Sequence, residues 1–286
     1  MSANDKYPEE SDRRRFVKGV VGGAALAGIG SAGAVMVNTA TDQPGGGGGI
    51  TEFVGIELVS GPAPNGMPMI PVRVDDEGYL MGHWPETEEI EEAGETITVA
   101  REDMGPYTYS SEWFQYCGLQ GVPGIRPDED QDNYFRSVTA PGYEWQQEDA
   151  EPGEPLHIDQ FDDYESWGNH IGDAGIGKPA DATWRSEDVS PADQLQVTVI
   201  RSQLIEERAE QGDNIAAWLQ ESTVDGVMAY LNVCTHFCCI PGYKDLEESI
   251  RFDAENRSYC QCHQSVYDPF TPVSDTFVAL PRPEDD

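Results

Sequence analysis

Short runs of alternating apolar and polar residues, rather than helical repeats, mark most of the ordered-looking parts of this chain. Five such runs are FVGIEL (53–58), MIPVRV (69–74), TITVA (96–100), QLQVTVIR (194–201) and GVMAYLNV (226–233). Because Gly, Pro and acidic residues bound them, each run predicts a β-strand. Residues 203–221 instead predict one or two helices interrupted at Gly212. We therefore expect a mainly β fold with functional loops at strand ends.

Residues 101–190 show no clean period of either kind. They are rich in Tyr, Trp, Gly, Pro, Asp and Glu. So many aromatic residues are atypical of a solvated linker, which argues against full disorder. We expect an irregular acidic insertion anchored by aromatic side chains, and we interpret it as a docking surface for partner subunits.

The N-terminus has the pattern of an export signal. Residues 12–18 read DRRRFVK, in which Arg13, Arg14, Phe16 and Lys18 look like a twin-arginine signal. The uncharged stretch Gly19–Val37 would span about 28 Å as a helix, close to the thickness of a bilayer core. It predicts a single transmembrane anchor, and a cleavable signal ending near residues 32–34 stays open as the alternative.

These features divide the chain into four parts. We expect a cytoplasmic twin-arginine segment (1–18), a transmembrane anchor (19–37), a glycine-rich hinge (38–50) and an extracytoplasmic domain (51–286). The hinge contains PGGGGG (44–49), which predicts a flexible tether that lets the domain swing. The predicted location is the cell membrane, with the domain on the extracytoplasmic side because the basic end stays in the cytoplasm.

The net charge of −36 changes the picture of possible partners. Nucleic acid is excluded, because phosphate binding needs clustered Lys and Arg. The acidity is spread from about residue 52 to the end, and lysine is scarce. Such a surface is typical of proteins from extreme halophiles, in which concentrated salt screens self-repulsion. An acidic surface that docks a basic partner is the alternative.

Candidate metal chemistry is concentrated in two short boxes, CTHFCC (234–239) and CQCHQS (260–265). Each contains a His among several Cys. Two Cys and two His suit a soft-to-borderline metal centre, and one extra Cys in each box can link the two loops. Structural Cys₂His₂ zinc and a pure disulfide framework are the alternatives. The remaining histidines, His83, His157 and His170, are isolated and expected to be surface or hydrogen-bonded residues, and Cys117 is isolated as well.

The pattern C-T-H-x-x-C followed by C-x-C-H-x-S-x-Y-D resembles Rieske iron–sulfur proteins, and more narrowly the Rieske subunit of cytochrome bc-type quinol-oxidising complexes. The resemblance implies a Rieske-type antiparallel β head. It also implies that Cys234 and Cys260 bind one iron of a [2Fe–2S] cluster, whereas His236 and His263 bind the other. The part that carries the cluster is residues 226–283.

Further residues follow from the same resemblance. Cys239 and Cys262 would form a disulfide between the two loops. Ser265 and Tyr267 match the hydroxyl residues that hydrogen-bond to cluster and ligand sulfur in this family. Such hydroxyl donors favour the reduced, more negative state, so a high reduction potential is expected.

The implied function is electron transfer. The domain would accept one electron from membrane quinol, held by a cytochrome b subunit, and pass it to a cytochrome c or a blue-copper protein. His236 and His263 would take part in catalysis, because their outer nitrogens couple proton uptake to reduction. The chain would thus be an oxidoreductase subunit that catalyses nothing alone.

Several positions depart from the family pattern. Cys238 and Gln264 stand where Gly is usual, and Cys238 is expected either to be a free thiol or to pair with Cys117. The loop that covers the cluster is usually G-P-x-P, for which residues 280–283 (LPRP) are the nearest match. In the family, further strands usually follow this loop, and they do not follow residues 280–283 here. We therefore expect residues 50–100 to supply part of the β scaffold.

Other functions also stay open. A Rieske subunit of a molybdenum oxidase, such as arsenite oxidase, shares the signal and the loop disulfide, but a swinging hinge would serve no purpose there. A Rieske oxygenase needs a second iron site of two His and a carboxylate, for which the chain has no motif. A zinc-stabilised binding module at the cell surface is the alternative without electron transfer.

Overall fold

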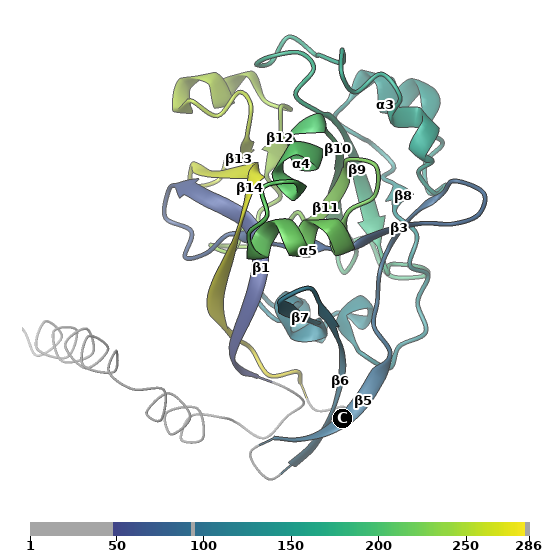
Figure 1. Ribbon diagram of the computed structural model, residues 1–286, viewed down its shortest axis with the longest axis vertical. Helices are drawn as coiled ribbons and strands as arrows, with labels where there is room; N and C mark the ends of the chain where they lie inside the picture. The colour runs from purple at the N-terminus through teal and green to yellow at the C-terminus, as the bar shows by residue number, and fades with distance from the viewer. Residues whose placement is uncertain (1–47, 93–94, 284–286) are drawn as a thin grey trace, which may run out of the picture. The chain divides into compact units, whose positions relative to one another are not determined.

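One nine-stranded antiparallel sheet organises the residues that this computed structural model describes, which are 48–92 and 95–283. The strand order is β12-β13-β14-β1-β2-β11-β10-β9-β8. The sheet is strongly curled, and the prediction of a mainly β fold is confirmed (Figure 1). The predicted export segment, the anchor and most of the hinge lie outside the described residues. Within 48–92 and 95–283, no helix has the length and apolar character needed to cross a membrane.

The elements have the following bounds. The strands are β1 (Gly49–Ser60), β2 (Met67–Ile70), β3 (Val72–Val74), β4 (Leu80–Gly82), β5 (Thr87–Glu92), β6 (Glu95–Met104), β7 (Tyr107–Ser110), β8 (Arg136–Ser137), β9 (Lys178–Trp184), β10 (Leu195–Arg201), β11 (Val227–Leu231), β12 (Gly242–Tyr243), β13 (Ser258–Cys260) and β14 (Ser265–Ala279). The α-helices are α3 (Glu144–Asp149), α4 (Gln203–Ala209) and α5 (Asn214–Ser222). The 3-10 helices are η1 (Ser111–Phe114), η2 (Leu119–Gly121), η3 (Pro123–Ile125), η4 (Ile158–Phe161) and η5 (Glu247–Phe252).

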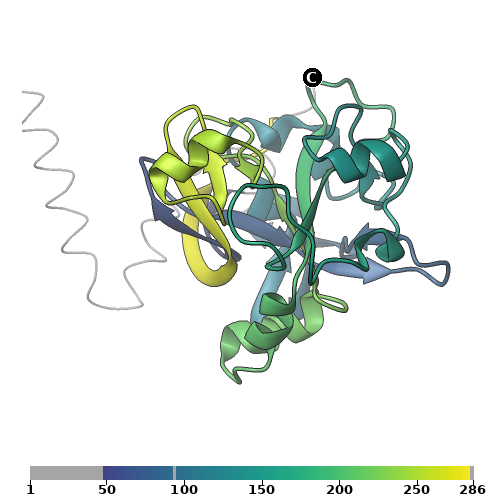
Figure 2. The ribbon, with the colours of Figure 1, turned by 90° about the horizontal axis from the view of Figure 1, so that it is seen from above.

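The longest pairing joins the two ends of the described chain. Strand β1 runs antiparallel to β14 from Gly49 opposite Ala279 to Ser60 opposite Val266. The two strands form the long twisted ribbon in Figure 1, and Figure 2 shows them beside each other from above. Strand β14 is continuous from the end of the second box to Ala279. Strands β1 and β2 supply part of the scaffold from residues 50–100, as expected.

Helices α4 and α5 each begin at a side chain that caps the helix, and a glycine lies between them. The Ser202 hydroxyl accepts a hydrogen bond from the Leu204 N–H, and the Asp213 carboxylate accepts one from the Ala216 N–H. Side-chain acceptors of this kind satisfy the first free N–H groups of a helix. Gly212 lies between the helices with a φ of 76°, a left-handed conformation that glycine adopts without strain. The predicted interruption at Gly212 is therefore present.

Residues 101–190 are mostly loops and short helices, but they are not an addition outside the core. Strand β9 pairs along its whole length with β10 and belongs to the main sheet, which differs from the expectation of an irregular segment. The fully buried rings of Trp113, Phe114 and Trp184 join the central hydrophobic core. The indole ring of Trp113 packs 5.2 Å from that of Trp218 on α5. Sequence periodicity missed β9 because KPADATW places small and polar residues among its apolar positions.

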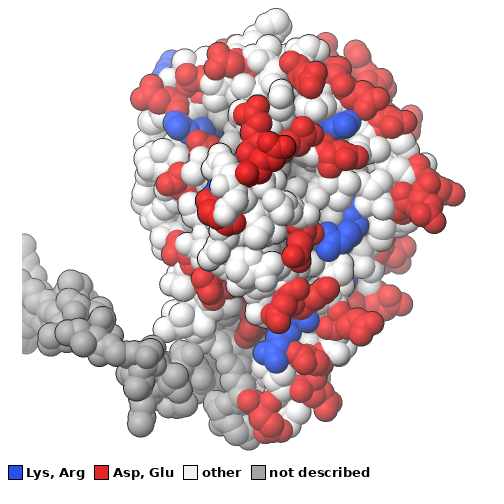
Figure 3. Space-filling model, in the orientation of Figure 1, with Lys and Arg blue, Asp and Glu red and all other residues white. Residues whose placement is uncertain are grey.

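Carboxylates spread over the surface, as the visible face in Figure 3 shows. Two of the four lysines are withdrawn from that surface. Lys178 is buried, donates to the Asp163 carboxylate at 2.6 Å and lies 4.1 Å from the ring centre of Trp145. Lys244 is buried as well, and its ammonium donates to the Asp173 carbonyl. These cations hold loops of residues 101–190 against the sheet, and the exposed surface is left even more acidic.

Candidate metal centre

Strand register brings three distant loops to one edge of the sheet. Ser60 at the end of β1 lies opposite Val266 near the start of β14, so the loop 61–66 leaves the same edge that the second box enters. Strand β2 begins at that edge and pairs antiparallel with β11, with Tyr230 opposite Met69. The end of β11 therefore points to the same edge, and the first box follows it. Loops 61–66, 232–241 and 261–264 thus converge.

The first box forms a tight turn directly after β11. The Cys238 N–H donates to the Cys234 carbonyl at 3.0 Å, and the Cys234 N–H donates to the Cys239 carbonyl at 2.8 Å. On its outer side, the Thr235 hydroxyl donates to the Asn65 carbonyl at 2.7 Å. The turn folds the backbone back on itself, so Cys234 points inward while His236 lies at its tip.

The second box is the turn of the β13–β14 hairpin. Cys260 pairs with Ser265 as the last ladder position, and the Gln264 N–H donates to the Cys260 carbonyl at 2.8 Å. Gln264 has a φ of 63°, a left-handed conformation that closes this four-residue turn. The geometry buries Cys260 at the base of the turn and exposes His263 near its tip.

The four predicted metal ligands lie on these two loops as one pair of cysteines and one pair of histidines. Cys234 and Cys260 are free cysteines, and both are buried. The rings of His236 and His263 lie 4.7 Å apart, centre to centre, at 80° to each other. His236 is half-buried, whereas His263 is exposed. Two thiols therefore lie inside and two imidazoles lie toward the surface.

Backbone N–H groups point at both sulfur atoms. The Cys234 sulfur accepts hydrogen bonds from the N–H groups of His236 and Phe237, and the Cys260 sulfur accepts them from those of Cys262 and His263. Donors of this kind stabilise negative charge on sulfur. These donors therefore favour the thiolate at each sulfur, which is the form that binds a metal.

The two thiols also share a proton. The hydrogen bond with Cys260 is the main cause that lowers the pKa of Cys234 to about 5, and the same bond raises the pKa of Cys260. The pair therefore gives up a first proton easily and the second with difficulty. A cation between the sulfurs would replace that shared proton, as thiolate ligands require.

One imidazole nitrogen on the histidine side is buried and unpartnered. Nδ1 of His236 is buried and has no hydrogen-bond partner among the described residues. Buried polar atoms are usually paired, so this nitrogen, 4.7 Å from a second imidazole when measured between ring centres, has a free lone pair that could bind a metal. The donor set, two soft thiolates with two imidazoles, fits zinc or an iron–sulfur cluster.

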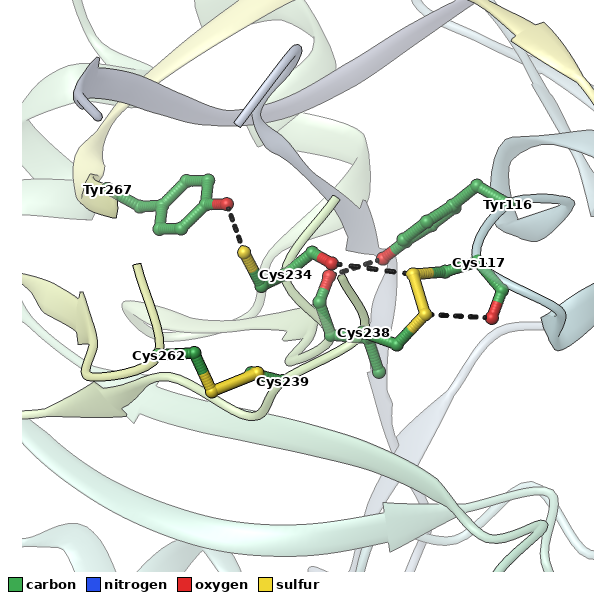
Figure 4. Close-up of a disulfide and its surroundings, with 8 residues drawn as sticks. Tyr116, Cys117, Cys234, Cys238, Cys239, Cys262 and Tyr267 are labelled. Atoms are coloured by element: carbon green, nitrogen blue, oxygen red, sulfur yellow. Dashed lines mark hydrogen bonds between the residues drawn. A yellow bond between two sulfur atoms is a disulfide. The ribbon is translucent and has the colours of Figure 1, made fainter. Parts of the chain in front are cut away.

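The Tyr267 hydroxyl lies at a ligand sulfur, whereas the Ser265 hydroxyl contacts the loop 61–66. The Tyr267 hydroxyl lies 3.1 Å from the Cys234 sulfur, as Figure 4 shows. Burial raises the pKa of Tyr267, so its hydroxyl stays protonated and can donate to a thiolate. Ser265 is buried, and its oxygen accepts a hydrogen bond from the Ala63 N–H at 3.3 Å. That acceptor role leaves the Ser265 proton available to a sulfur.

Two disulfides tie the first box to its surroundings. Cys239 is bonded to Cys262, so the two boxes are linked as the resemblance implies. The sulfurs of Cys239, Cys260 and Cys262 lie within 4.8 Å of one another, but only Cys260 among them is free to bind a metal. Cys238 is bonded to Cys117, which decides between the two states left open by the sequence. Cys117 is thus not isolated.

The loop that covers the site was missed by sequence reasoning. Residues 61–66 read GPAPNG and carry the G-P-x-P pattern. Gly61 has a φ of 105°, and a Cβ there would come within 2.5 Å of Ser265 Cα, so only glycine fits. Residues 280–283, the match chosen from sequence, lie elsewhere, and the Leu280 N–H donates to the Gln115 carbonyl. A search for G-P-x-P along the whole chain would have found this loop.

The three isolated histidines are surface or hydrogen-bonded residues, as expected. Nε2 of His83 lies 2.6 Å from a carboxylate oxygen of Glu102. The His157 ring accepts from the Asp159 N–H and begins η4. His170 is exposed and has a φ of 71°.

The first box exposes two large apolar side chains, one of which packs against both imidazoles. The ring of Phe237 lies 4.3 Å from His236 and 5.2 Å from His263, and Phe237 is 64% exposed. Ile240 is 52% exposed.

Comparison with known protein families, with curated proteins and with solved structures gives no match. The arrangement of these side chains therefore carries the functional argument.

Proposed function

We propose that this chain is a Rieske-type electron-transfer subunit of a cytochrome bc-type complex. It takes one electron from membrane quinol and passes it to a cytochrome c or a blue-copper protein. The observation that carries the proposal is the convergence of two buried free thiols and two adjacent imidazoles on loops joined by a disulfide.

The residues present fit a [2Fe–2S] cluster. Cys234 and Cys260 would hold it on the inner side, and His236 and His263 on the outer side. When bound, the cluster supplies a group that gains and loses one electron at a higher potential than clusters held by four thiolates. The protein contributes N–H and O–H donors at the sulfur side, which favour added negative charge.

The imidazoles can exchange a proton with a partner molecule. Each has two ring nitrogens, so binding through one leaves the other to hold a proton. His263 is exposed, the apolar ring of Phe237 lies 5.2 Å from it, and the first-box loop also exposes Ile240. A lipid-like hydroquinone has a matching character, with hydroxyl groups on an apolar ring. The outer nitrogen can therefore accept a hydroxyl proton while the electron moves inward.

Backbone conformation supports the resemblance at the positions where the residue types depart from it. Cys238 and Gln264 replace the usual glycines, yet their φ angles are 61° and 63°. These are left-handed conformations, which glycine adopts most readily. The loop turns thus keep the shape for which the family uses glycine. The G-P-A-P loop over Ser265 adds independent support, because it stands far away in the sequence.

The test is spectroscopic and uses the full chain produced with iron. We expect iron and acid-labile sulfide in equal amounts, and a rhombic EPR signal with average g near 1.9 after reduction by ascorbate. His263→Ala should abolish that signal, whereas His170→Ala, an exposed histidine outside the boxes, should retain it. Zinc without an EPR signal would overturn the proposal. A signal that only dithionite elicits would refute a quinol-linked role.

A further inference from the structure

Two neighbouring cysteines of the first box form disulfides with two different parts of the chain. Cys239 is linked to Cys262 in the second box, whereas Cys238 is linked to Cys117, which lies between η1 and η2. Figure 4 shows the two disulfides on either side of the turn. The first box is therefore held at two places, and only one of the bonds involves the second box.

Contacts around Cys117 reach the backbone of the ligand turn. The Tyr116 hydroxyl donates to the Val233 carbonyl at 2.9 Å, one residue before the ligand Cys234. The Cys117 sulfur lies 3.6 Å from the Cys234 carbonyl oxygen, and the Cys238 sulfur lies 3.0 Å from the Cys117 carbonyl oxygen. These sulfur contacts are not hydrogen bonds, because a disulfide carries no proton. Residues 116–117 thus hold both ends of the turn.

Both cysteines of this disulfide have a left-handed backbone conformation, which is unfavourable for cysteine. Cys117 has a φ of 58°, and Cys238 has a φ of 61°. Side chains with a Cβ disfavour this left-handed region, and glycine occupies it freely. The chain nevertheless has cysteine at both positions. A covalent link offers a physical reason for retaining two locally unfavourable residues.

The link acts on the turn that presents His236. Because the Cys238 N–H bonds to the Cys234 carbonyl, fixing residue 238 fixes the intervening residues 235–237 as well. Of the two loops, only the first has this extra attachment to η1 and η2 among the disulfides of the described residues. The second box depends on its hairpin and on Cys239–Cys262.

We propose that the Cys117–Cys238 disulfide, together with the Tyr116 hydrogen bond, is a positioning clamp for the first ligand loop. It holds Cys234 and His236 in place relative to the η1–η2 segment, independently of the Cys239–Cys262 disulfide. Cys117, Cys238 and Tyr116 are positioning residues that touch no metal. The inference rests on the proposed function, since it concerns how that centre is retained and oriented.

The test compares two ways of removing the clamp in the full, iron-loaded chain. C117G/C238G removes the bond and relieves the left-handed backbone at both positions, whereas C117S/C238S removes the bond and keeps the strain. We expect both variants to fold and to lose iron to a chelator about tenfold faster than the unmodified chain, as for other supporting residues of metal sites. The EPR line shape of the remaining centre should change.

Matched variants separate positioning from stability. Ile205→Ala empties part of the core at α4 and lowers the melting temperature, but it should leave the rate of iron loss and the line shape unchanged. If the double variants lower only the melting temperature in the same way, the clamp is merely structural and the inference is wrong. If they do not fold, Tyr116→Phe decides, because it keeps the disulfide and removes only the hydrogen bond. Faster iron loss or a changed line shape in Tyr116→Phe supports the clamp, and unchanged values overturn it.

Failure of the proposed function is distinguishable. In that case the unmodified chain itself gives no iron–sulfur spectrum. Failure of the clamp leaves that spectrum intact in every variant.

Discussion

Tyr267→Phe isolates one hydrogen bond at the proposed centre. The Tyr267 hydroxyl lies 3.1 Å from the Cys234 sulfur, and the rest of the ring is fully buried. Phenylalanine keeps the ring and its packing, so the substitution removes the hydroxyl alone. A reduced centre carries one more negative charge, and the donor therefore stabilises it more than the oxidised centre. We expect the variant to bind metal normally and to have a lower midpoint potential.

The size of the shift follows from the strength of the bond. Hydrogen bonds to charged groups contribute about 1.5–3 kcal/mol, and only the difference between oxidation states acts on the potential. If that difference is about 1–1.4 kcal/mol, the midpoint falls by about 40–60 mV, since a one-electron couple shifts about 59 mV per tenfold change.

The assay is a redox titration followed by EPR or circular dichroism, with Tyr230→Phe as the matched control. Tyr230 is equally buried, and its hydroxyl lies 2.5 Å from the Ser258 oxygen rather than at a ligand sulfur. The control should therefore keep the midpoint of the unmodified chain. Equal midpoints in Tyr267→Phe and Tyr230→Phe, with full metal content in both, would refute the reasoning.

Four further predictions concern the cover loop, a turn, a buried acid and the surface charge. Ser265→Ala leaves the buried Ala63 N–H unpaired and should lower unfolding stability by about 1–3 kcal/mol, measured by chemical denaturation, while redox titration should show a lower midpoint. Gln264→Gly relieves a left-handed residue and should raise stability by about 0.5–1 kcal/mol; a loss in denaturant titrations would instead assign the glutamine side chain a role. Burial raises the pKa of Asp181 to about 6, so the folded state holds more protons than the unfolded state between about pH 4 and 6, and stability falls as pH rises through that window. Asp181→Asn keeps an acceptor for the Gly142 N–H and should remove this fall, which is at most about 3 kcal/mol. Identical pH profiles of stability in the variant and the unmodified chain would contradict the assignment. Raising KCl to molar concentration should raise the melting temperature, because a net charge of −36 repels itself less when screened, and a salt-independent melting temperature would count against salt adaptation.

Local sequence was sufficient for several of the long strands and for proposing a ligand set. Alternation in QLQVTVIR and GVMAYLNV identifies β10 and β11, because side chains on successive strand residues point to opposite faces. The break at Gly212 separates α4 from α5 for a reason contained in one residue. The two boxes are so dense in Cys and His that their side chains must meet if the loops meet.

Tertiary structure decided which loops meet. The G-P-x-P pattern of residues 61–64 can be read from the sequence, but the pairing of β1 with β14, which brings this loop to the second box, joins segments more than 200 residues apart. Strand β9 escaped notice because its burial comes from neighbouring strands rather than from an apolar pattern of its own.

The partner of Cys238 was decided in the same way. Pairing depends on the distance between two Cα atoms, here 5.6 Å, which the fold sets across 121 residues. The sequence by itself therefore determined the chemistry that this protein can offer, because residue type fixes which atoms bind metal and protons. Only the folded chain decided which cover, clamp and hydrogen-bond donors act on that chemistry, because strand pairing and packing are long-range.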